Sequence, residues 1–160
     1  MKLERYGEFR VLTLRETGLE GYNATGETPE NIADYYRTVI ATDPRHNADV
    51  ETLIGITLST RRKITGYYVV ATGTLDTLLC HPREVFRPAI VANAAAIVVL
   101  HNHPSGDYSP SEADIKVTRE LIRAGQLLRV ELLDHVIMGA ATPERPKGFC
   151  SLRELGYFFE

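Results

Sequence analysis

The sequence predicts an α/β sandwich built around a mixed β-sheet. From residue 51 onward, after an opening hairpin, segments with strand and helix patterns alternate. The apolar run at residues 94–100 has the length and composition of a buried strand. The chain has 160 residues, 44% of them hydrophobic and 24% charged, which suits one globular domain with a sizeable core.

Residues 1–48 are predicted to form an N-terminal extension that packs on a core domain of residues 49–160. Within the extension, residues 9–14 partly alternate apolar and polar side chains, which predicts an edge strand. Thr28 and Pro29 are typical of a helix start with proline at the first helical position. One stripe of that helix carries its large apolar side chains, which are Ile32, Tyr35, Tyr36 and Ile40.

Tyr35 and Tyr36 are expected to cover the edge of the main sheet, an interpretation that we favour over a ligand-binding ledge. Residues 41–48 follow as a polar linker. His46 lies in this linker and is expected to be exposed to solvent.

The core domain is expected to open with a β-hairpin. Residues 51–58 and 64–71 have strand patterns, and residues 59–63 form the turn between them. The turn contains the basic run Arg61-Arg62-Lys63. We interpret this short run as a solvated turn rather than a contact for nucleic acid.

A helix is predicted after a short strand or loop at residues 73–79. It opens at His81-Pro82 and runs to residue 92, and Pro88 is expected to kink it. We assign His81 to the helix start rather than to a metal site. The next strand is predicted at residues 95–100.

The second core helix is predicted at residues 111–124, with Gly125 as its C-terminal stop. A strand follows at residues 128–138 and contains the adjacent pair Asp134-His135. Neighbours on a strand point to opposite faces, so this pair cannot act jointly and is expected to have a structural or supporting role.

Residues 140–148 are expected to form a loop, followed by a short C-terminal helix. The run Ser151-Leu152-Arg153-Glu154 matches a capping box, which predicts that helix. Cys80 and Cys150 lie far apart in the sequence and are expected to be reduced thiols of a cytoplasmic protein. No apolar run approaches the roughly 20 residues of a membrane helix, so we expect no membrane contact.

Two histidines leave the strand at residues 95–100, and a carboxylate follows in the first turn of the next helix. Residues i and i+2 of an extended segment point to the same side, so His101 and His103 can face one point. Two histidines and one aspartate can bind zinc and leave a fourth position for water. The loop before Asp114 is long enough to bring its carboxylate to the histidines.

Ser111 and Asp114 also have an interpretation that needs no metal. They occupy the N-cap and third positions of a capping box at the start of the helix. Both interpretations can hold at once, because a capped helix start is a rigid place for a metal ligand. The spacing alone therefore leaves the metal site open.

The pattern His-x-His-Pro, six residues, then Ser-x-x-Asp resembles the JAMM metalloprotease motif of the JAB/MPN family. The fuller strings at residues 101–107 and 110–114 are similar to its RadC-like branch. The resemblance runs from about residue 50 to residue 139, including residues 73–75, 81–87, 93–96 and 133–137. It implies an α-β-α sandwich with a mixed sheet, similar to the cytidine deaminase arrangement, although the zinc deaminase signature itself is absent.

The resemblance also implies roles for individual residues. By motif position, His101, His103 and Asp114 would bind Zn²⁺. Ser111 would assist at the attacking water or the oxyanion, and Glu51 would be the general base. Only the resemblance distinguishes Glu51 among the 21 acidic residues.

These roles favour a zinc-dependent hydrolase of amide or isopeptide bonds, a JAMM-type metallopeptidase whose partner is a peptide or protein. A DNA-repair-associated accessory protein of RadC type is the alternative. The formal charge of −3 does not support a DNA-binding surface, and the helix-hairpin-helix signature is missing. A non-catalytic scaffold is a third function, although such relatives lack the ligands that this chain keeps. No pattern in the sequence specifies an oligomeric state.

Overall fold

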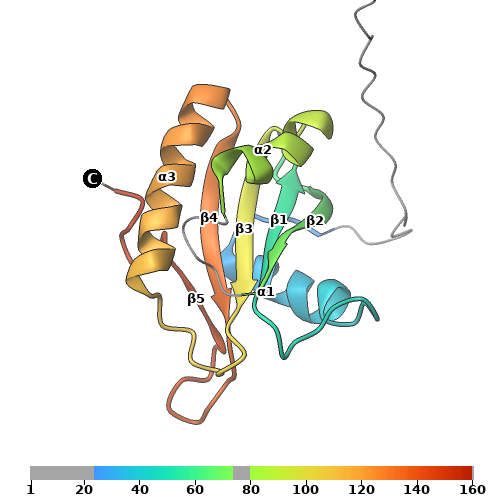
Figure 1. Cartoon of the computed structure of the whole chain (residues 1–160). Coiled ribbons are helices and arrows are strands. Elements are labelled where there is room, and N and C mark those ends of the chain that lie inside the picture. The colour runs from blue at the N-terminus through green and yellow to red at the C-terminus, as the bar shows by residue number, and fades with distance from the viewer. Residues whose placement is uncertain (1–23, 74–79, 160) are drawn as a thin grey trace, which may run out of the picture.

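The computed structural model describes residues 24–73 and 80–159, whose arrangement is shown in Figure 1. The edge strand expected at residues 9–14 and most of the segment expected at 73–79 lie outside these ranges. Among the described residues, no helix combines the length and the apolarity that a membrane crossing requires.

The described chain begins with two helical segments and a β-hairpin, and helices and strands then alternate up to a final short strand. The elements are α1 (Pro29–Tyr35), the π-helix η1 (Tyr36–Ile40), β1 (Thr52–Leu58), β2 (Ile64–Thr72), α2 (Pro82–Val91), β3 (Ala96–Asn102), α3 (Glu112–Leu128), β4 (Glu131–Met138) and β5 (Phe149–Ser151). The strands form one sheet in the order β2-β1-β3-β4-β5. β3 and β4 are parallel and are joined through α3, whereas the other neighbours are antiparallel. The predicted mixed α/β fold is therefore confirmed.

Helices cover both faces of the sheet (Figure 1). On one face, side chains of β1 and β3 such as Leu53 and Val99 pack against Phe86 of α2 and Leu121 of α3. The opposite face of the same strands packs against α1 and η1. This alternation follows from the two-residue period of a strand, and it divides the core into two layers.

The predicted apolar stripe of the first helix is buried, but its position differs from the prediction. Tyr35 and Tyr36 belong to the same cluster as Val98 and Leu100 of the central strand β3. They therefore cover a face of the sheet rather than its edge. The division of the chain at residue 48 stays a prediction, and α1 contributes directly to the core of the sheet.

Of the predictions for two histidines outside the motif, one is confirmed and the other is wrong. His81 is the N-cap of α2, where its Nδ1 accepts a hydrogen bond from the Arg83 amide at 3.0 Å, so its assignment to the helix start is confirmed. The expectation that His46 is exposed is wrong. Its Nε2 lies 2.9 Å from the Tyr36 hydroxyl, and the half-buried position lowers the pKa of the imidazole.

The prediction that Gly125 ends α3 is wrong. The helix continues to Leu128, and its C-cap Arg129 has a left-handed φ of 57°. A Cβ at Gly125 would lie 2.6 Å from the carbonyl oxygen of Val130. The glycine is therefore needed for the close return of the chain toward β4, which begins at Glu131 rather than at residue 128.

The expected C-terminal helix is replaced by a short strand and turns. Ser151 ends β5, and residues 152–158 form turns. The Ser151 Oγ accepts from the Glu154 amide at 3.0 Å, as a capping box requires, but it also donates to Asp134 at 2.6 Å. Gly156, with a φ of 92°, then takes the chain out of helical geometry.

Candidate metal centre

The candidate metal centre lies where β1 begins and β3 ends. Leu53 of β1 pairs with His101 of the antiparallel β3, so Glu51, just before β1, lies beside the end of β3. His103 follows β3 by one residue, and the first turn of α3 carries Asp114. The structure thus brings two interior strands and one helix terminus together at one end of the strands.

Four side chains converge there, and their potential ligand atoms all lie within 4.8 Å of one another. The two Nε2 atoms of His101 and His103 are 2.9 Å apart. Asp114 Oδ1 is 3.3 Å from His101 Nε2, and Asp114 Oδ2 is 3.7 Å from His103 Nε2. Glu51 Oε1 lies 3.8 Å and 4.0 Å from the same two nitrogens.

The four side chains range from fully buried to partly exposed. His101 and Asp114 expose 0% and 3% of their side chains, whereas His103 and Glu51 expose 17% and 21%. The site therefore has a closed end at His101 and Asp114, and an end near His103 and Glu51 that water or a ligand can reach.

A chain of hydrogen bonds fixes which nitrogen of His101 carries the proton. The Thr118 hydroxyl donates to the carbonyl oxygen of Asp114 at 2.6 Å, so it can only accept from His135 Nδ1, which is also 2.6 Å away. His135 Nε2 is then an acceptor, and His101 Nδ1 donates to it at 2.8 Å. His101 Nε2 is left with a lone pair directed into the site.

His103 has the same tautomer for a simpler reason. Its Nδ1 lies 2.6 Å from the carbonyl oxygen of Asp107, which can only accept, so Nδ1 carries the proton. When both rings are neutral, the two Nε2 atoms are unprotonated and face each other at 2.9 Å, where they cannot hydrogen-bond to one another. A cation between the two lone pairs would remove their repulsion, so these residues fit a divalent metal ion.

The pKa shifts of the buried histidines agree with neutral rings. Burial, and to a lesser extent the neighbouring His103, lowers the pKa of His101 to about 3. Burial, followed by the nearby His101, holds the pKa of His135 well below its usual range. Both rings are therefore neutral at pH 7, which is the form that binds a metal.

A β-bulge brings His135 to the site. β3 residues Ile97 and Val98 pair with Leu132 and Asp134, so Leu133 is an extra residue in β4. The bulge reverses the alternation beyond it, and His135 lies on the α3 face next to Thr118. Asp134 lies on the other face, so the expectation that this pair acts separately is consistent with the structure.

Ser111 and Asp114 form the predicted capping box. The Ser111 hydroxyl and backbone amide both donate to Asp114 Oδ2, at 2.7 Å and 2.8 Å, and Ser111 Oγ accepts from the Asp114 amide at 3.1 Å. The helix start thus fixes the carboxylate that faces the histidines. The role of Ser111 toward an oxyanion stays a prediction.

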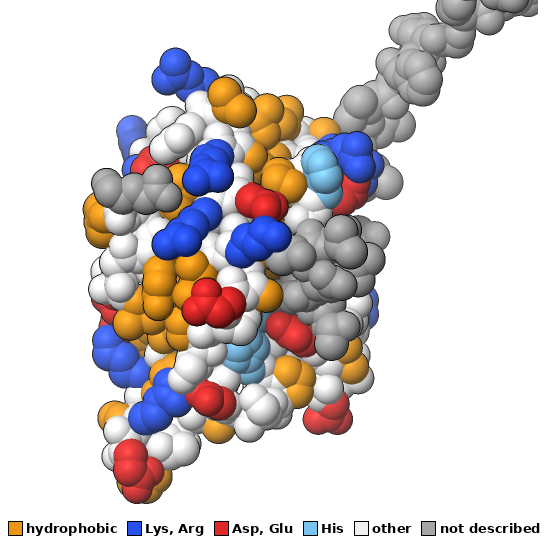
Figure 2. All heavy atoms as spheres, turned by 60° about the vertical axis from the view of Figure 1, so that its left-hand side comes forward, with side chains coloured by type: hydrophobic (Ala, Val, Ile, Leu, Met, Phe, Trp, Pro, Cys, Tyr) orange, Lys and Arg blue, Asp and Glu red, His pale blue; other side chains and the backbone are white. Residues whose placement is uncertain are grey.

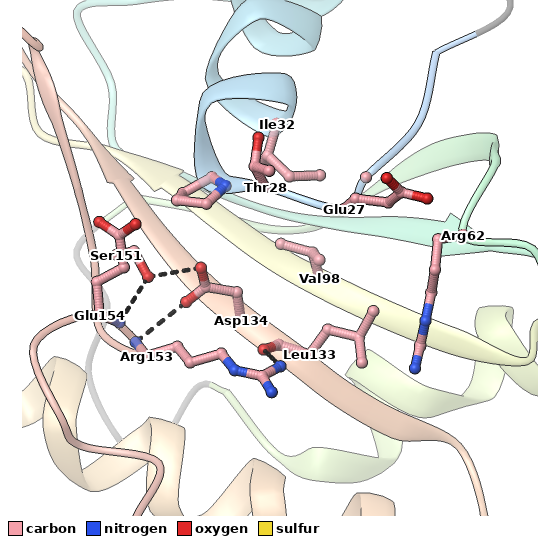
Figure 3. A pocket seen from close by; sticks show the side chains of 12 residues that line it. Glu27, Thr28, Ile32, Arg62, Val98, Leu133, Asp134, Ser151, Arg153 and Glu154 are labelled. Atoms are coloured by element: carbon pink, nitrogen blue, oxygen red, sulfur yellow. Dashed lines mark hydrogen bonds between the residues drawn. The ribbon is translucent and has the colours of Figure 1, made fainter.

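A cavity of about 550 Å³ opens on the face of the sheet that α1 covers (Figure 3), and none of the four converging side chains lines it. Asp134 lies in its wall, where it accepts hydrogen bonds from Ser151 and from the Arg153 amide. Burial raises the pKa of Asp134, and these hydrogen bonds oppose the rise. Asp134 therefore fastens β5 and the following turn to β4, which is a structural role.

Three features of the site were not predicted from the sequence: Thr118, the ring contact of His135 and the contacts of Asn102. Asn102 lies between the two motif histidines and bonds to the backbone on both sides of Glu51. Each contact joins residues that are far apart in the sequence, 17 positions for Thr118 with His135 and 50 for Asn102 with Thr52, so no local pattern indicates it.

The chain resembles proteins of one family over most of its length. A family model described as "RadC-like JAB domain" matches residues 27–157. A UPF0758 protein of Shouchella clausii is 37% identical over 131 residues, which cover 82% of this chain and 52% of that protein. A UPF0758 protein of Moorella thermoacetica is 46% identical over 97 residues, which cover 61% of this chain and 42% of that protein. The chain thus spans about half the length, or less, of these curated relatives.

Proposed function

The chain belongs to the family of RadC-like JAB domains, and from this premise we propose that it is a zinc-dependent hydrolase of amide or isopeptide bonds, a metallopeptidase of JAMM type. One observation supports the proposal most strongly. Two imidazole lone pairs, a buried carboxylate and a partly exposed carboxylate converge at an opening to solvent. The substrate would be a peptide or a protein that carries such a bond.

His101, His103 and Asp114 would hold the ion. Two imidazole nitrogens and one carboxylate oxygen are a common donor set for catalytic zinc, and they leave a coordination position open. Zinc bound by these residues would supply an acidified water and a Lewis acid for the scissile carbonyl.

Glu51 would move the protons of the reaction. Its carboxylate lies at the exposed end of the site, 3.8 Å and 4.0 Å from the two histidine nitrogens, which leaves room for a water between them. It would accept a proton from the attacking water and deliver it to the leaving amine nitrogen. Ser111 would orient Asp114 and, after rotation of its hydroxyl, donate to the developing oxyanion.

The alternative function, a nucleic-acid accessory protein, has weaker support. Figure 2 views the α3 side of the molecule and shows acidic side chains among the basic ones. A shallow groove along α3 has this mixture, with Lys116, Arg119 and Arg123 beside Glu112 and Glu120. Nucleic-acid surfaces are typically more uniformly basic.

The experiment that tests the proposal is metal analysis followed by a cleavage assay. We expect about one zinc per chain in the wild type and a sharp loss in Asp114→Ala. Asp107→Ala is the control, because it removes an exposed carboxylate of the same loop that bonds to Arg145. This control should retain zinc. A wild type that takes up no zinc, or an Asp114→Ala variant that keeps it, would contradict the site.

The zinc-loaded protein is then screened with a mixture of internally quenched peptides. We expect cleavage that a chelator abolishes and that Glu51→Gln reduces at least a hundredfold while zinc stays bound. Cleavage that persists without metal would refute the proposed mechanism.

A further inference from the structure

We propose that Asn102 is the positioning residue that holds Glu51 at the metal centre. The proposal rests on the proposed function, because it concerns the general base of that reaction. Asn102 lies between His101 and His103 in the sequence. Its side chain hydrogen-bonds to Thr52, Val50 and Ala48 instead of to either histidine.

The Asn102 side chain bonds to the backbone on both sides of Glu51. Its Oδ1 accepts from the Thr52 amide at 3.0 Å, and its Nδ2 donates to the Val50 carbonyl oxygen at 3.1 Å. The same Nδ2 lies 3.2 Å from the Ala48 carbonyl oxygen. Asn102 is buried, with 5% of the residue exposed, and its bond to the Thr52 amide forms away from bulk water, where leaving a partner unpaired is costly.

These bonds replace the end of the β1–β3 ladder. The last backbone pair joins Leu53 to His101, and the next pair would be Thr52 with Asn102. The Asn102 side chain takes the place of that backbone pair. On the other side, the Glu51 carbonyl oxygen accepts from the Gly73 amide at 2.8 Å. The backbone at Glu51 is therefore held from both neighbouring strands.

Residues 101–103 thus supply the two histidine ligands and also position the segment that carries Glu51. His101 and His103 point to one side of the strand and supply imidazoles, while Asn102 points away from them and reaches the segment that carries Glu51. The contacts with Thr52, Val50 and Ala48 require one hydrogen-bond acceptor and two donors in a short side chain. Only asparagine combines these groups at this length. Aspartate would keep the acceptor, but its second oxygen would face the carbonyl oxygens of Val50 and Ala48.

The kinetic test compares Asn102→Ala with a control in the same strand. Thr57 lies at the end of β1 far from Glu51, and its buried hydroxyl donates to the carbonyl oxygen of Gly66 in β2. Thr57→Val removes this hydrogen bond and so weakens the β1–β2 pairing without changing a contact of Glu51. On a quenched peptide that the wild type cleaves, we expect Asn102→Ala to lower kcat about ten- to a hundredfold, with KM changed less than about threefold and zinc retained. Thr57→Val should stay within about twofold of the wild type. Asn102→Asp should be at least as slow as Asn102→Ala.

A double-mutant cycle separates positioning from a general structural role. If Asn102 acts through Glu51, Asn102→Ala should cost less than about twofold in a Glu51→Gln background. Full additivity of the two losses, or loss of zinc from Asn102→Ala, would overturn the proposal.

A structural measurement keeps the proposal testable even if no peptide is cleaved. We expect faster hydrogen exchange at the Thr52 amide in zinc-loaded Asn102→Ala but not in Thr57→Val, and a displaced Glu51 carboxylate in a crystal structure of Asn102→Ala. An unmoved carboxylate with a protected amide would overturn the proposal. Failure of cleavage in the wild type would instead count against the hydrolase function alone.

Discussion

His135 Nε2 lies 2.8 Å from Nδ1 of His101, although the two histidines are 34 positions apart in the sequence. The contact lies at the buried end of the metal centre, where His101 is fully enclosed. It gives the Nδ1 proton of His101 a partner and therefore keeps the lone pair of Nε2 directed at the other ligands. The affinity for metal should thus depend on residues that never contact the ion.

Thr118→Val should weaken zinc binding about 10- to 100-fold. The change removes the hydroxyl that accepts the Nδ1 proton of His135, so the ring can take the tautomer that protonates Nε2. His101 would then lose its acceptor and could place a proton where the metal binds. Competition with a chromophoric chelator at pH 7 measures the change in affinity.

The control for this variant is Thr42→Val. Thr42 also donates to the carbonyl oxygen four residues before it, but it lies on the surface far along the chain from the metal ligands. Equal zinc affinity in Thr118→Val and wild type would show that the hydroxyl does not control the tautomer.

The metal-free protein should lose stability as the pH falls below about 6.5. Burial lowers the folded-state pKa of His101 to about 3, so below 6.5 the unfolded state binds a proton that the folded state excludes. The free energy of unfolding should fall by about 1.4 kcal/mol per pH unit for each such histidine. His135 contributes in the same direction. Urea unfolding of chelator-treated protein at pH 7.0, 6.0 and 5.0, chosen to lie above the usual carboxylate range, measures this slope.

Comparison with His101→Gln isolates the contribution of His101. The variant should have a shallower pH dependence, by about the slope of one proton, whatever its stability at pH 7. An identical slope in both proteins would mean that His101 is not held neutral in the folded state.

Gly125→Ala should destabilise the protein by about 1–3 kcal/mol, even though alanine is the better helix former. The added methyl group would meet the Val130 carbonyl oxygen at 2.6 Å and the Phe86 ring at 3.2 Å. Gly66→Ala is the control, because its Cβ would come no closer than 3.8 Å to Thr57. Thermal unfolding of both variants tests the difference, and a stabilised Gly125→Ala would show that the helix end can move.

Local patterns predicted the parts of the site that local geometry sets. The capping box at Ser111 and Asp114 depends on four consecutive residues, so the spacing was sufficient. The convergence of His101 and His103 follows from the two-residue period of a strand. Glu51 lacks any such local signal, and only the resemblance to the JAB/MPN family indicated it.

Other features depend on contacts between distant segments, which the sequence does not display. Gly125 matches a helix stop in sequence, but the approach of Val130 explains it. The polar composition of residues 41–48 predicts an exposed linker, but the linker turns back so that His46 contacts the Tyr36 hydroxyl. β5 has three residues, too few for a strand pattern, and forms because β4 offers a free edge.

The extra residue at Leu133 sets the face of every later side chain in β4. If Leu133 paired with Val98 and the bulge were absent, the carboxylate of Asp134 would be directed toward His101, and the His135 ring would enter the cavity behind the sheet. Deleting Leu133 would leave the later pairs in register, but inserting one residue after Asp134 would reverse the faces of all residues that follow, as a frameshift changes every later codon. The metal centre therefore depends on the count of residues in β4 as much as on their identity.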